Sequence, residues 1–427
     1  MLRSAARWAR RRWYFVGPFV LVVAGVIVYF TWGQRPGDVL NTTVPFQAPP
    51  TTTTPAKKPK AKKKSQPELV NWPIYGFDLQ RTHYLPAADA KNVNPPFRSK
   101  WSLNAGSLME YQPVLWKGTM FFLANNGVAW AVRTKTGKVL WKRDIGTLSA
   151  SSPAYTDGHV YVTTLSGKIS ALNASNGRVM WARNLGTRTE SSPLAYRGNI
   201  YFGAENGTVY AMRGSDGKIL WTYHTSGDVT AGPAYSKGLL YFGDYGGNMQ
   251  AVRIGNGSLV WKKHEAGLPF GRSGGFYGTP AIAFDRVYVG NLDRKVYSFS
   301  ARTGQLAWSH STGNYVYAAP AVAAVPGVTP SVYVGSYDGH FYALDARTGA
   351  PRWTFAAGDS ISGAGTVIGR VVYFSTVHTH KTFGVDVESG KQVWSFGHGA
   401  YTPAISDGQT LYLTGYSSEF ALVPRRR

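Results

Sequence analysis

The densest group of side chains suited to binding a ligand lies in residues 262–280, KKHEAGLPFGRSGGFYGTP. Phe270, Arg272, Phe276 and Tyr277 offer ring faces, a guanidinium and a hydroxyl within a short span. Ligand pockets combine apolar and aromatic walls with a few convergent polar groups. We therefore expect a candidate binding surface in this insertion; the alternative is that its aromatic side chains fill a central channel for stability. The other residues expected to complete the surface are Arg188, Glu190, Asp228, Tyr315 and Tyr317.

Residues for catalysis or metal binding form no comparable group. A Ca²⁺ ion takes roughly six to eight oxygen ligands, often from converging carboxylates. His378 and His380 form a His-x-His pair in TVHTHKTF, but two histidines alone are more typical of an ordinary exposed loop. We therefore assign no catalytic, cofactor-binding or metal-ligating residue and expect no cofactor. The acidic residues expected near the same surface are scattered: Glu110, Glu190, Asp228 and Asp359.

Tryptophans that recur every 40 to 47 residues define the framework that must position these side chains. From the second of them onward, a Gly stands four residues earlier and an Ala, Ser or Gly stands ten residues earlier. Each unit has alternating apolar runs separated by turns, which predicts a short antiparallel meander, and such repeats close into β-propellers. We interpret each indole as packing on small residues between blades. The repeat tryptophans are Trp101, Trp141, Trp181, Trp221, Trp261, Trp308, Trp353 and Trp394.

The number of unit openings predicts eight blades. Seven units open with a proline, from Pro113 to Pro403, and one opens without proline near residues 363–366. The last unit ends before a Trp strand can form, whereas Trp101 precedes the first unit. We expect residues 95–104 to close the last blade beside residues 417–423, because closure removes free sheet edges. The predicted fold is an all-β, eight-bladed propeller over residues 71–424, expected to be monomeric.

The motif A-x-D-x-x-T-G-x-x-x-W, clearest in ALDARTGAPRW at 343–353, resembles the repeat of the pyrroloquinoline-quinone (PQQ) type β-propellers. This family includes the quinoprotein alcohol dehydrogenases and the propeller lipoprotein of the outer-membrane barrel assembly machinery. The resemblance covers about residues 71–424. Five units lack the acid of the motif and have Arg133, Asn173, Arg213, Arg253 and Ser300 instead.

The resemblance implies two alternative functions. In quinoprotein dehydrogenases the cofactor lies in the central funnel with a metal ion, a catalytic Asp, a stacking Trp and, in the alcohol dehydrogenases, a disulfide between adjacent cysteines. This chain has no Cys, and only Arg188 and Arg272 are available near the funnel for the three carboxylates of PQQ. We expect a non-catalytic protein- or ligand-binding scaffold; the alternative is a PQQ-dependent dehydrogenase.

Residues 13–32, WYFVGPFVLVVAGVIVYFTW, contain no charged side chain. As a helix, twenty residues span roughly 30 Å, the hydrocarbon thickness of a bilayer. Five Arg lie within residues 1–12, so the positive-inside rule predicts a cytoplasmic tail and an extracytoplasmic propeller. A cleavable signal peptide would have a shorter apolar core and a small-residue cleavage site. We expect a single-pass anchor in the cell membrane, which replaces the lipid anchor that a chain without Cys cannot carry.

Residues 33–70 are rich in Thr, Pro and Lys and are expected to form a disordered linker. Residues 1–70 hold 12 Lys and Arg against 2 acids; the remaining residues hold 34 against 20, a net charge of +14. An extracytoplasmic domain without a recognition motif is not expected to bind nucleic acid. We expect the basic propeller to act in the cell envelope on an envelope protein or an anionic envelope polymer.

Overall fold

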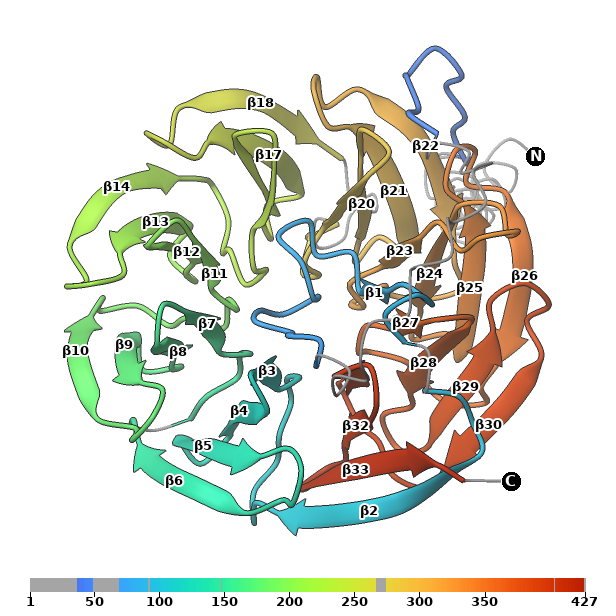
Figure 1. Cartoon of the computed structure of the whole chain (residues 1–427). Helices are drawn as coiled ribbons and strands as arrows, with labels where there is room; N and C mark the ends of the chain where they lie inside the picture. Colours follow the sequence, from blue (N-terminus) through green and yellow to red (C-terminus); the bar gives the residue numbers. More distant parts are fainter. Residues whose placement is uncertain are drawn as a thin grey trace, which may run out of the picture.

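The computed structural model describes residues 37–48, 69–90, 93–146, 148–265, 274–402 and 404–425. Within these ranges the secondary structure is all β, and the strands form eight sheets arranged as blades around a central axis (Figure 1). Each blade has four strands, and one sheet also includes the short parallel strand β1 (Tyr84–Leu85). The prediction of an all-β, eight-bladed propeller is confirmed.

The blades are numbered in chain order, and their strands run from the axis outward. Blade 1 comprises β3 (Val114–Trp116), β4 (Thr119–Ala124), β5 (Val128–Arg133) and β6 (Val139–Asp144). Blade 2 comprises β7 (Ala154–Thr156), β8 (His159–Thr163), β9 (Lys168–Asn173) and β10 (Val179–Asn184). Blade 3 comprises β11 (Leu194–Tyr196), β12 (Asn199–Gly203), β13 (Thr208–Arg213) and β14 (Ile219–His224). Blade 4 comprises β15 (Ala234–Ser236), β16 (Leu239–Gly243), β17 (Asn248–Arg253) and β18 (Leu259–His264). Blade 5 comprises β19 (Ala281–Ala283), β20 (Arg286–Gly290), β21 (Lys295–Ser300) and β22 (Leu306–Ser311). Blade 6 comprises β23 (Ala321–Ala323), β24 (Ser331–Gly335), β25 (His340–Asp345) and β26 (Pro351–Ala356). Blade 7 comprises β27 (Thr366–Ile368), β28 (Val371–Ser375), β29 (Thr382–Asp386) and β30 (Gln392–Phe396). Blade 8 comprises β31 (Ile405–Ser406), β32 (Leu411–Thr414), β33 (Ser418–Pro424) and β2 (Phe97–Asn104).

Burial along the strands follows from this stacking of blades. A middle strand such as β20 is buried at every residue, because both of its faces contact other parts of the propeller. An outer strand such as β14 is largely exposed, because it lies at the rim. Apolar runs therefore fill the middle strands, while charged and polar residues accumulate in the outer ones.

The repeat tryptophans connect consecutive blades through the repeat glycines. Within its own blade each Trp from Trp141 onward lies opposite the small residue ten positions earlier, as in the pair Ala211↔Trp221. The contact with the next blade is different: a Cβ on Gly217 would lie 2.6 Å from the ring of Trp181. Trp181 Nε1 also donates a 2.6 Å hydrogen bond to the carbonyl of Gly214 in the same turn. The predicted packing between blades thus occurs on the glycine, not on the small residue, and the φ of +69° at Gly217 independently favours glycine.

Among the described residues, seven of the eight repeat tryptophans donate this hydrogen bond to the next blade. The exception is Trp394, which faces the blade closed by β2. No turn joins β33 to β2, so Trp394 instead packs edge-to-face on Phe97, with 5.3 Å between ring centroids. Strand β2 pairs antiparallel with β33, with Trp101 opposite Ala421. The predicted closure of the last blade is confirmed.

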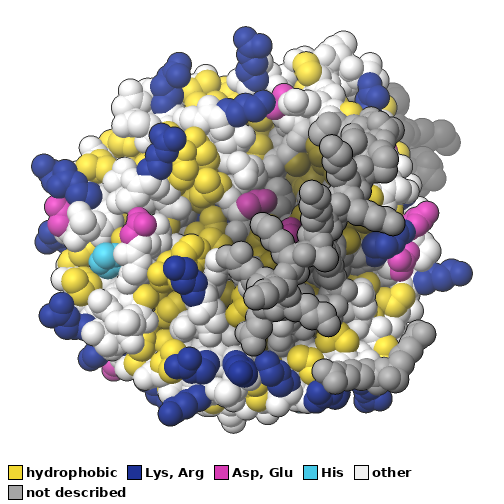
Figure 2. All heavy atoms as spheres, in the orientation of Figure 1, with side chains coloured by type: hydrophobic (Ala, Val, Ile, Leu, Met, Phe, Trp, Pro, Cys, Tyr) yellow, Lys and Arg dark blue, Asp and Glu magenta, His cyan; other side chains and the backbone are white. Residues whose placement is uncertain are grey.

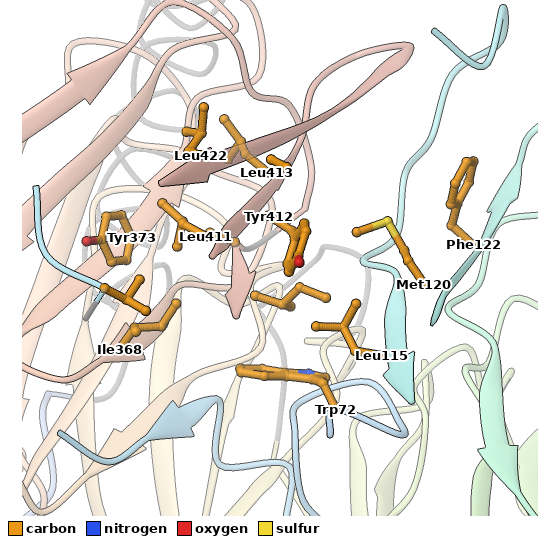
Figure 3. Close-up of a cluster of buried hydrophobic side chains, with 14 of the residues drawn as sticks. Trp72, Leu115, Met120, Phe122, Ile368, Tyr373, Leu411, Tyr412, Leu413 and Leu422 are labelled. Atoms are coloured by element: carbon orange, nitrogen blue, oxygen red, sulfur yellow. The ribbon is translucent and has the colours of Figure 1, made fainter. Parts of the chain in front are cut away.

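Residues 69–85, here called the lead-in segment, cross one end of the channel before the first blade begins (Figure 1). Figure 3 shows its Trp72, fully buried, beside Leu115 in the core cluster that joins the segment to blades 1, 7 and 8. Six backbone carbonyls of this segment accept hydrogen bonds, each from a different inner strand, so this one segment links six blades at the axis. The carbonyls that accept from the inner strands are those of Trp72 (from Leu115), Pro73 (Tyr155), Leu79 (Tyr235), Gln80 (Ile282), Thr82 (Val322) and His83 (Val367).

Residues 37–48, which the sequence analysis places in the disordered linker, pack on the rim of blade 5 (Figure 1). Leu40 forms a β-bridge to β22, and Val44 is buried. Arg286 donates hydrogen bonds to the carbonyls of Val44, at 2.7 Å, and Pro45, at 2.8 Å. The linker prediction is therefore wrong for these residues, because a buried guanidinium and a small apolar contact offset the cost of ordering them.

The remaining N-terminal predictions fall outside the described residues. These are the tail at 1–12, the membrane span at 13–32, and linker residues 33–36 and 49–68. In the part of the chain that the structure describes, no helix has the length and apolar character needed to cross a bilayer.

Lys and Arg side chains are distributed around the rim of the face shown in Figure 2, with few acidic side chains between them. This distribution agrees with the excess of basic residues in the sequence. The rim of the propeller is therefore suited to anionic surroundings.

Candidate functional site

A cavity of about 360 Å³ lies in the central channel and is lined by loops from all eight blades and by the lead-in segment. Its described lining includes no Lys or Arg side chain. The volume is near the lower end of the range for small-molecule pockets. The largest side chains around it are six tyrosines and two glutamates: Tyr75, Tyr111, Tyr277, Tyr317, Tyr337, Tyr401, Glu110 and Glu190.

One position of the repeat supplies much of this lining. In blades 1 to 6, the residue three positions before the blade-opening proline lines the cavity. Each such residue lies in the loop that enters an inner strand, so rigid blades bring side chains about 40 residues apart to one axis. These residues, here called the channel ring, are Glu110, Ala150, Glu190, Thr230, Tyr277 and Tyr317.

Glu190 is the centre of the polar contacts in the cavity. Tyr277 Oη lies at hydrogen-bonding distance from Glu190 Oε2, 3.5 Å. Arg188 Nη2 lies 3.7 Å from Glu190 Oε1, and Arg188 Nε lies 2.9 Å from Glu205 Oε2. Burial raises the pKa of Glu190, and the nearby carboxylates of Glu205 and Glu110 raise it further, against the opposing charge of Arg188. One guanidinium is thus shared by the carboxylates of Glu190 and Glu205, and Glu110 adds a third carboxylate, which leaves this side of the cavity negative.

Tyr277, Tyr317 and Tyr337 form a continuous aromatic wall. The rings of Tyr277 and Tyr317 are 5.2 Å apart in an edge-to-face arrangement, and those of Tyr317 and Tyr337 are 4.9 Å apart. Aromatic rings at such separations stabilise one another and hold their positions. The wall is therefore a preformed surface rather than a set of independent side chains.

The lead-in segment provides the floor of the cavity through Tyr75. Behind it, Arg81 is fully buried and donates to the carbonyls of Tyr75 at 2.5 Å, Pro233 at 3.1 Å and Pro193 at 3.2 Å. Burial lowers the pKa of Arg81 to about 9 and that of His83 to about 3, so near pH 7 the guanidinium is charged and the imidazole is neutral. The donors of Arg81 serve the backbone, which fixes the lead-in segment to blades 3 and 4.

The structure brings together part of the binding surface predicted from sequence. Glu190, Tyr277 and Tyr317 line the cavity, and Arg188 borders it through its contact with Glu190. Tyr315 is 38% exposed and packs beside Tyr317, with 6.0 Å between ring centroids, but does not belong to the lining.

Of the four other predicted residues, two are described by the structure, and neither lines the cavity. Phe276 is fully buried in the core of blade 5, with its ring 6.0 Å from that of Tyr297. Asp228 is absent from the lining, and its carbonyl accepts a backbone hydrogen bond from Tyr245. Phe270 and Arg272 lie outside the described residues.

Five residues of the cavity lining were not predicted as site residues from the sequence: Tyr75, Tyr111, Thr230, Tyr337 and Tyr401. For Thr230 a signal existed, because the register of the opening prolines identifies the whole channel ring. Tyr75 and Tyr337 lie outside that register, in the lead-in segment and in the turn between β24 and β25, and nothing in the repeat marks them.

The His-x-His pair separates in the structure. His378 Nδ1 lies 2.8 Å from Asp359 Oδ1, whereas the ring of His380 packs near that of Tyr416. Burial opposes ionisation of Asp359, but hydrogen bonds from Thr379 and His378 lower its pKa to about 2. Asp359 thus orders this loop. Over the described ranges, no group of three or more His, Asp or Glu side chains is arranged to hold a metal ion.

These features define an eight-bladed propeller of the PQQ type with an acidic, tyrosine-lined channel cavity. The chain belongs to the family described as outer membrane protein assembly factor BamB, whose model matches residues 124–291 and 295–419. The resemblance seen in the repeat motif is therefore confirmed. No sequence among the curated proteins matches the chain.

Solved structures share the fold at low sequence identity. BamB from Moraxella catarrhalis is 16% identical, with a TM-score of 0.65 over 77% of this chain and 100% of that chain. The quinohemoprotein alcohol dehydrogenase from Comamonas testosteroni is 15% identical, with a TM-score of 0.69 over 84% of this chain and 81% of that chain. A europium-containing methanol dehydrogenase is 15% identical, with a TM-score of 0.69 over 83% of this chain and 98% of that chain. These likenesses show the fold alone.

The described lining does not fit PQQ. A cofactor with three carboxylates requires convergent cations, because like charges repel strongly at a partly buried site. The cavity instead presents Glu110 and Glu190. Of the described arginines, Arg188 is paired with carboxylates and Arg81 donates to backbone carbonyls.

Proposed function

We propose that this protein is a non-catalytic scaffold of the cell envelope that binds a protein or a ligand through its propeller. Membership of the BamB family supports a scaffold role. The observation that carries the non-catalytic part is the composition of the described cavity lining, which presents two glutamates and six tyrosines rather than the cations that a quinone carboxylate would need.

The alternative function, a PQQ-dependent dehydrogenase, is supported by the likeness to quinohemoprotein alcohol dehydrogenases. The test is titration of the purified protein with PQQ and Ca²⁺, followed by a dye-linked assay with alcohols and sugars. We expect no stoichiometric uptake and no oxidation. Tight one-to-one PQQ binding, or alcohol oxidation that is lost in Glu190→Gln, would favour the enzyme.

The location of the propeller is part of the proposal: residues 13–32 span the cell membrane with residues 1–12 in the cytoplasm. A reporter fused after Arg427 should be active only outside the cytoplasm. Activity of a cytoplasmic reporter at that position, or a mature chain cut near residue 32, would contradict the anchor.

The basic rim is the proposed contact for an acidic envelope protein or an anionic envelope polymer. Crosslinking in intact membranes followed by purification of the chain should recover such a partner. Binding that persists unchanged from low to high salt would argue against a charged rim contact, since exposed charges are screened by salt.

A further inference from the structure

We infer that the channel cavity binds a small organic dication, an alkyl diamine or polyamine. The inference deepens the proposed function, because it rests on the cavity being a binding site rather than a catalytic one. Three independent properties of the cavity lead to it: its charge, its aromatic wall and an unpaired buried hydroxyl.

The charge of the cavity is opposite to that of the domain. The propeller carries a large excess of Lys and Arg, yet the described cavity lining contains Glu110 and Glu190 and no cationic side chain. The guanidinium of Arg188 is shared by Glu190 and Glu205, so the carboxylates outnumber it. Burial raises the pKa of Glu110, and the neutral side chain of Asn125 opposes this rise. A cationic ligand would relieve the repulsion between these acids.

The aromatic wall favours an organic cation over a metal ion. Ammonium groups are attracted to the faces of tyrosine rings, and alkyl chains bury favourably against them. Tyr277, Tyr317 and Tyr337 present such a surface beside Glu190. Ca²⁺ takes roughly six to eight oxygen ligands, which two carboxylates on separate blades do not supply.

Thr230 adds the third property. It is 8% exposed, belongs to the cavity lining, and its Oγ1 has no hydrogen-bond partner among the described residues. A buried hydroxyl without a partner destabilises the protein, and a ligand N–H would supply the missing partner. The hydroxyl lies in blade 4, between the carboxylate of blade 3 and the tyrosines of blades 5 and 6.

The number and placement of the acids indicate two ammonium groups rather than one. Glu110 and Glu190 occupy equivalent ring positions in blades 1 and 3, with only Ala150 of blade 2 between them in the ring. Glu110 is close enough to Glu190 to raise the pKa of Glu190. A ligand with two separated charges matches both, whereas a monoamine leaves one acid unmatched.

Isothermal titration calorimetry of the full-length purified chain at low salt tests the inference. The probes are 1,4-diaminobutane, 1-aminobutane, butane-1,4-diol and succinate. We expect 1,4-diaminobutane to bind saturably at one site and at least about tenfold more tightly than 1-aminobutane, since the diamine can form one more charge-assisted hydrogen bond. The diol and succinate should not bind. Equal affinity for mono- and diamine, or preference for succinate, would overturn the inference.

Variants locate the site. Glu110→Gln and Glu190→Gln should each weaken 1,4-diaminobutane at least about tenfold, Tyr317→Leu about three- to tenfold, and Thr230→Val about two- to fivefold. The matched controls are Tyr315→Leu, beside Tyr317 but outside the lining, and Glu388→Gln, an exposed acid paired with Arg370. Controls that weaken binding as much as the site variants would contradict the assignment.

The outcomes separate this inference from the proposed function. Uptake of PQQ would refute the non-catalytic scaffold and the dication site together. Absence of diamine binding in a folded protein that also rejects PQQ would refute only the dication site. Near-ultraviolet circular dichroism of each variant shows whether the fold is retained.

Discussion

The blade junctions and the channel ring use the same repeat in opposite ways. At the junctions, seven tryptophans occupy equivalent positions in the described structure. Each ring lies over a glycine of the next blade, and each indole N–H donates to a backbone carbonyl near that glycine. In the channel ring, equivalent positions carry Glu, Ala, Glu, Thr, Tyr and Tyr. Identity at the junctions reflects one packing requirement shared by all blades. Diversity in the channel ring indicates that the scaffold tolerates many side chains at these positions. The chemistry of the cavity, rather than packing, therefore determines which residue stands at each of them.

The largest expected effect comes from breaking the one junction that is closed by a distant segment. Deletion of residues 97–103 removes most of β2, exposes the edge of β33 and removes Trp101 from its blade junction. We expect the deleted chain to lose its cooperative thermal transition, as followed by near-ultraviolet circular dichroism. Deletion of the lysine tract at 57–64 is the control and should leave the transition in place. A cooperative transition without β2 would show that closure is dispensable.

A smaller effect should follow from adding a methyl group to one of the glycines that contact a repeat tryptophan. Gly217 and Gly186 have nearly the same φ, +69° and +71°, but a Cβ would meet the ring of Trp181 only at Gly217. Gly186→Ala should cost about 1–2 kcal/mol from backbone strain alone. Gly217→Ala should cost about 1–3 kcal/mol more, because the methyl group displaces a packed indole. Urea denaturation of both variants measures the difference, and equal costs would show that the ring contact is unimportant.

Strand β33, which pairs with β2 to close the last blade, also contains a buried acid whose contribution to the free energy of unfolding depends on pH. Glu419 in β33 is fully buried; Oε1 accepts from Thr414 at 2.8 Å, and Oε2 has no partner among the described residues. Burial raises its pKa to about 7. The folded state therefore holds this proton more tightly than the unfolded state, so stability falls as pH rises from about 4.5 to about 7, by on the order of 3 kcal/mol.

Glu419→Gln should remove this contribution. Denaturation of the variant and the parent at pH 4.5 and pH 8 measures it, and the variant should gain most at pH 8. An unchanged pH dependence would mean that Glu419 is not the group responsible.

The smallest expected effect on stability is in the channel ring. Glu190→Gln removes a partly buried charge with a raised pKa, and the amide can still accept from Tyr277. We expect a change in unfolding free energy within about 0.5 kcal/mol. A change this small, compared with the larger loss of unfolding free energy in Gly217→Ala, would support the distinction between packing positions and binding positions. A loss comparable to that of Gly217→Ala would remove the distinction.

The sequence predicted the parts of the fold that repetition makes visible. Trp spacing identified the blades, and the orphan position of Trp101 identified the closing strand, because both depend on local order along the chain. The site was harder to predict, because each blade contributes single residues that meet only in three dimensions. Glu190, Tyr277 and Tyr317 were found through their residue types, whereas Tyr75 enters from the lead-in segment, whose path is not repeated.

Two errors have a common physical origin. Phe276 lies in an insertion rich in aromatic residues, yet its own ring fills the core of blade 5. Residues 37–48 lie in a polar, proline-rich stretch, yet Val44 and two carbonyls find partners on blade 5. In both cases the average composition of a segment concealed the individual side chain whose contacts decide its place.

The pairing of β2 with β33 also imposes a waiting time during synthesis. Asn104 at the end of β2 and Ser418 at the start of β33 are 314 residues apart in the sequence. At about 5–20 residues per second, the ribosome needs roughly 15–60 s to deliver the partner strand. Throughout that interval β2 has no native partner, and a β33 from another copy of the chain would satisfy it equally well. The closure that pairs β33 in the finished protein thus makes strand exchange between nascent chains its main hazard of misassembly. Dilution, or a chaperone that shields β2, is the natural protection.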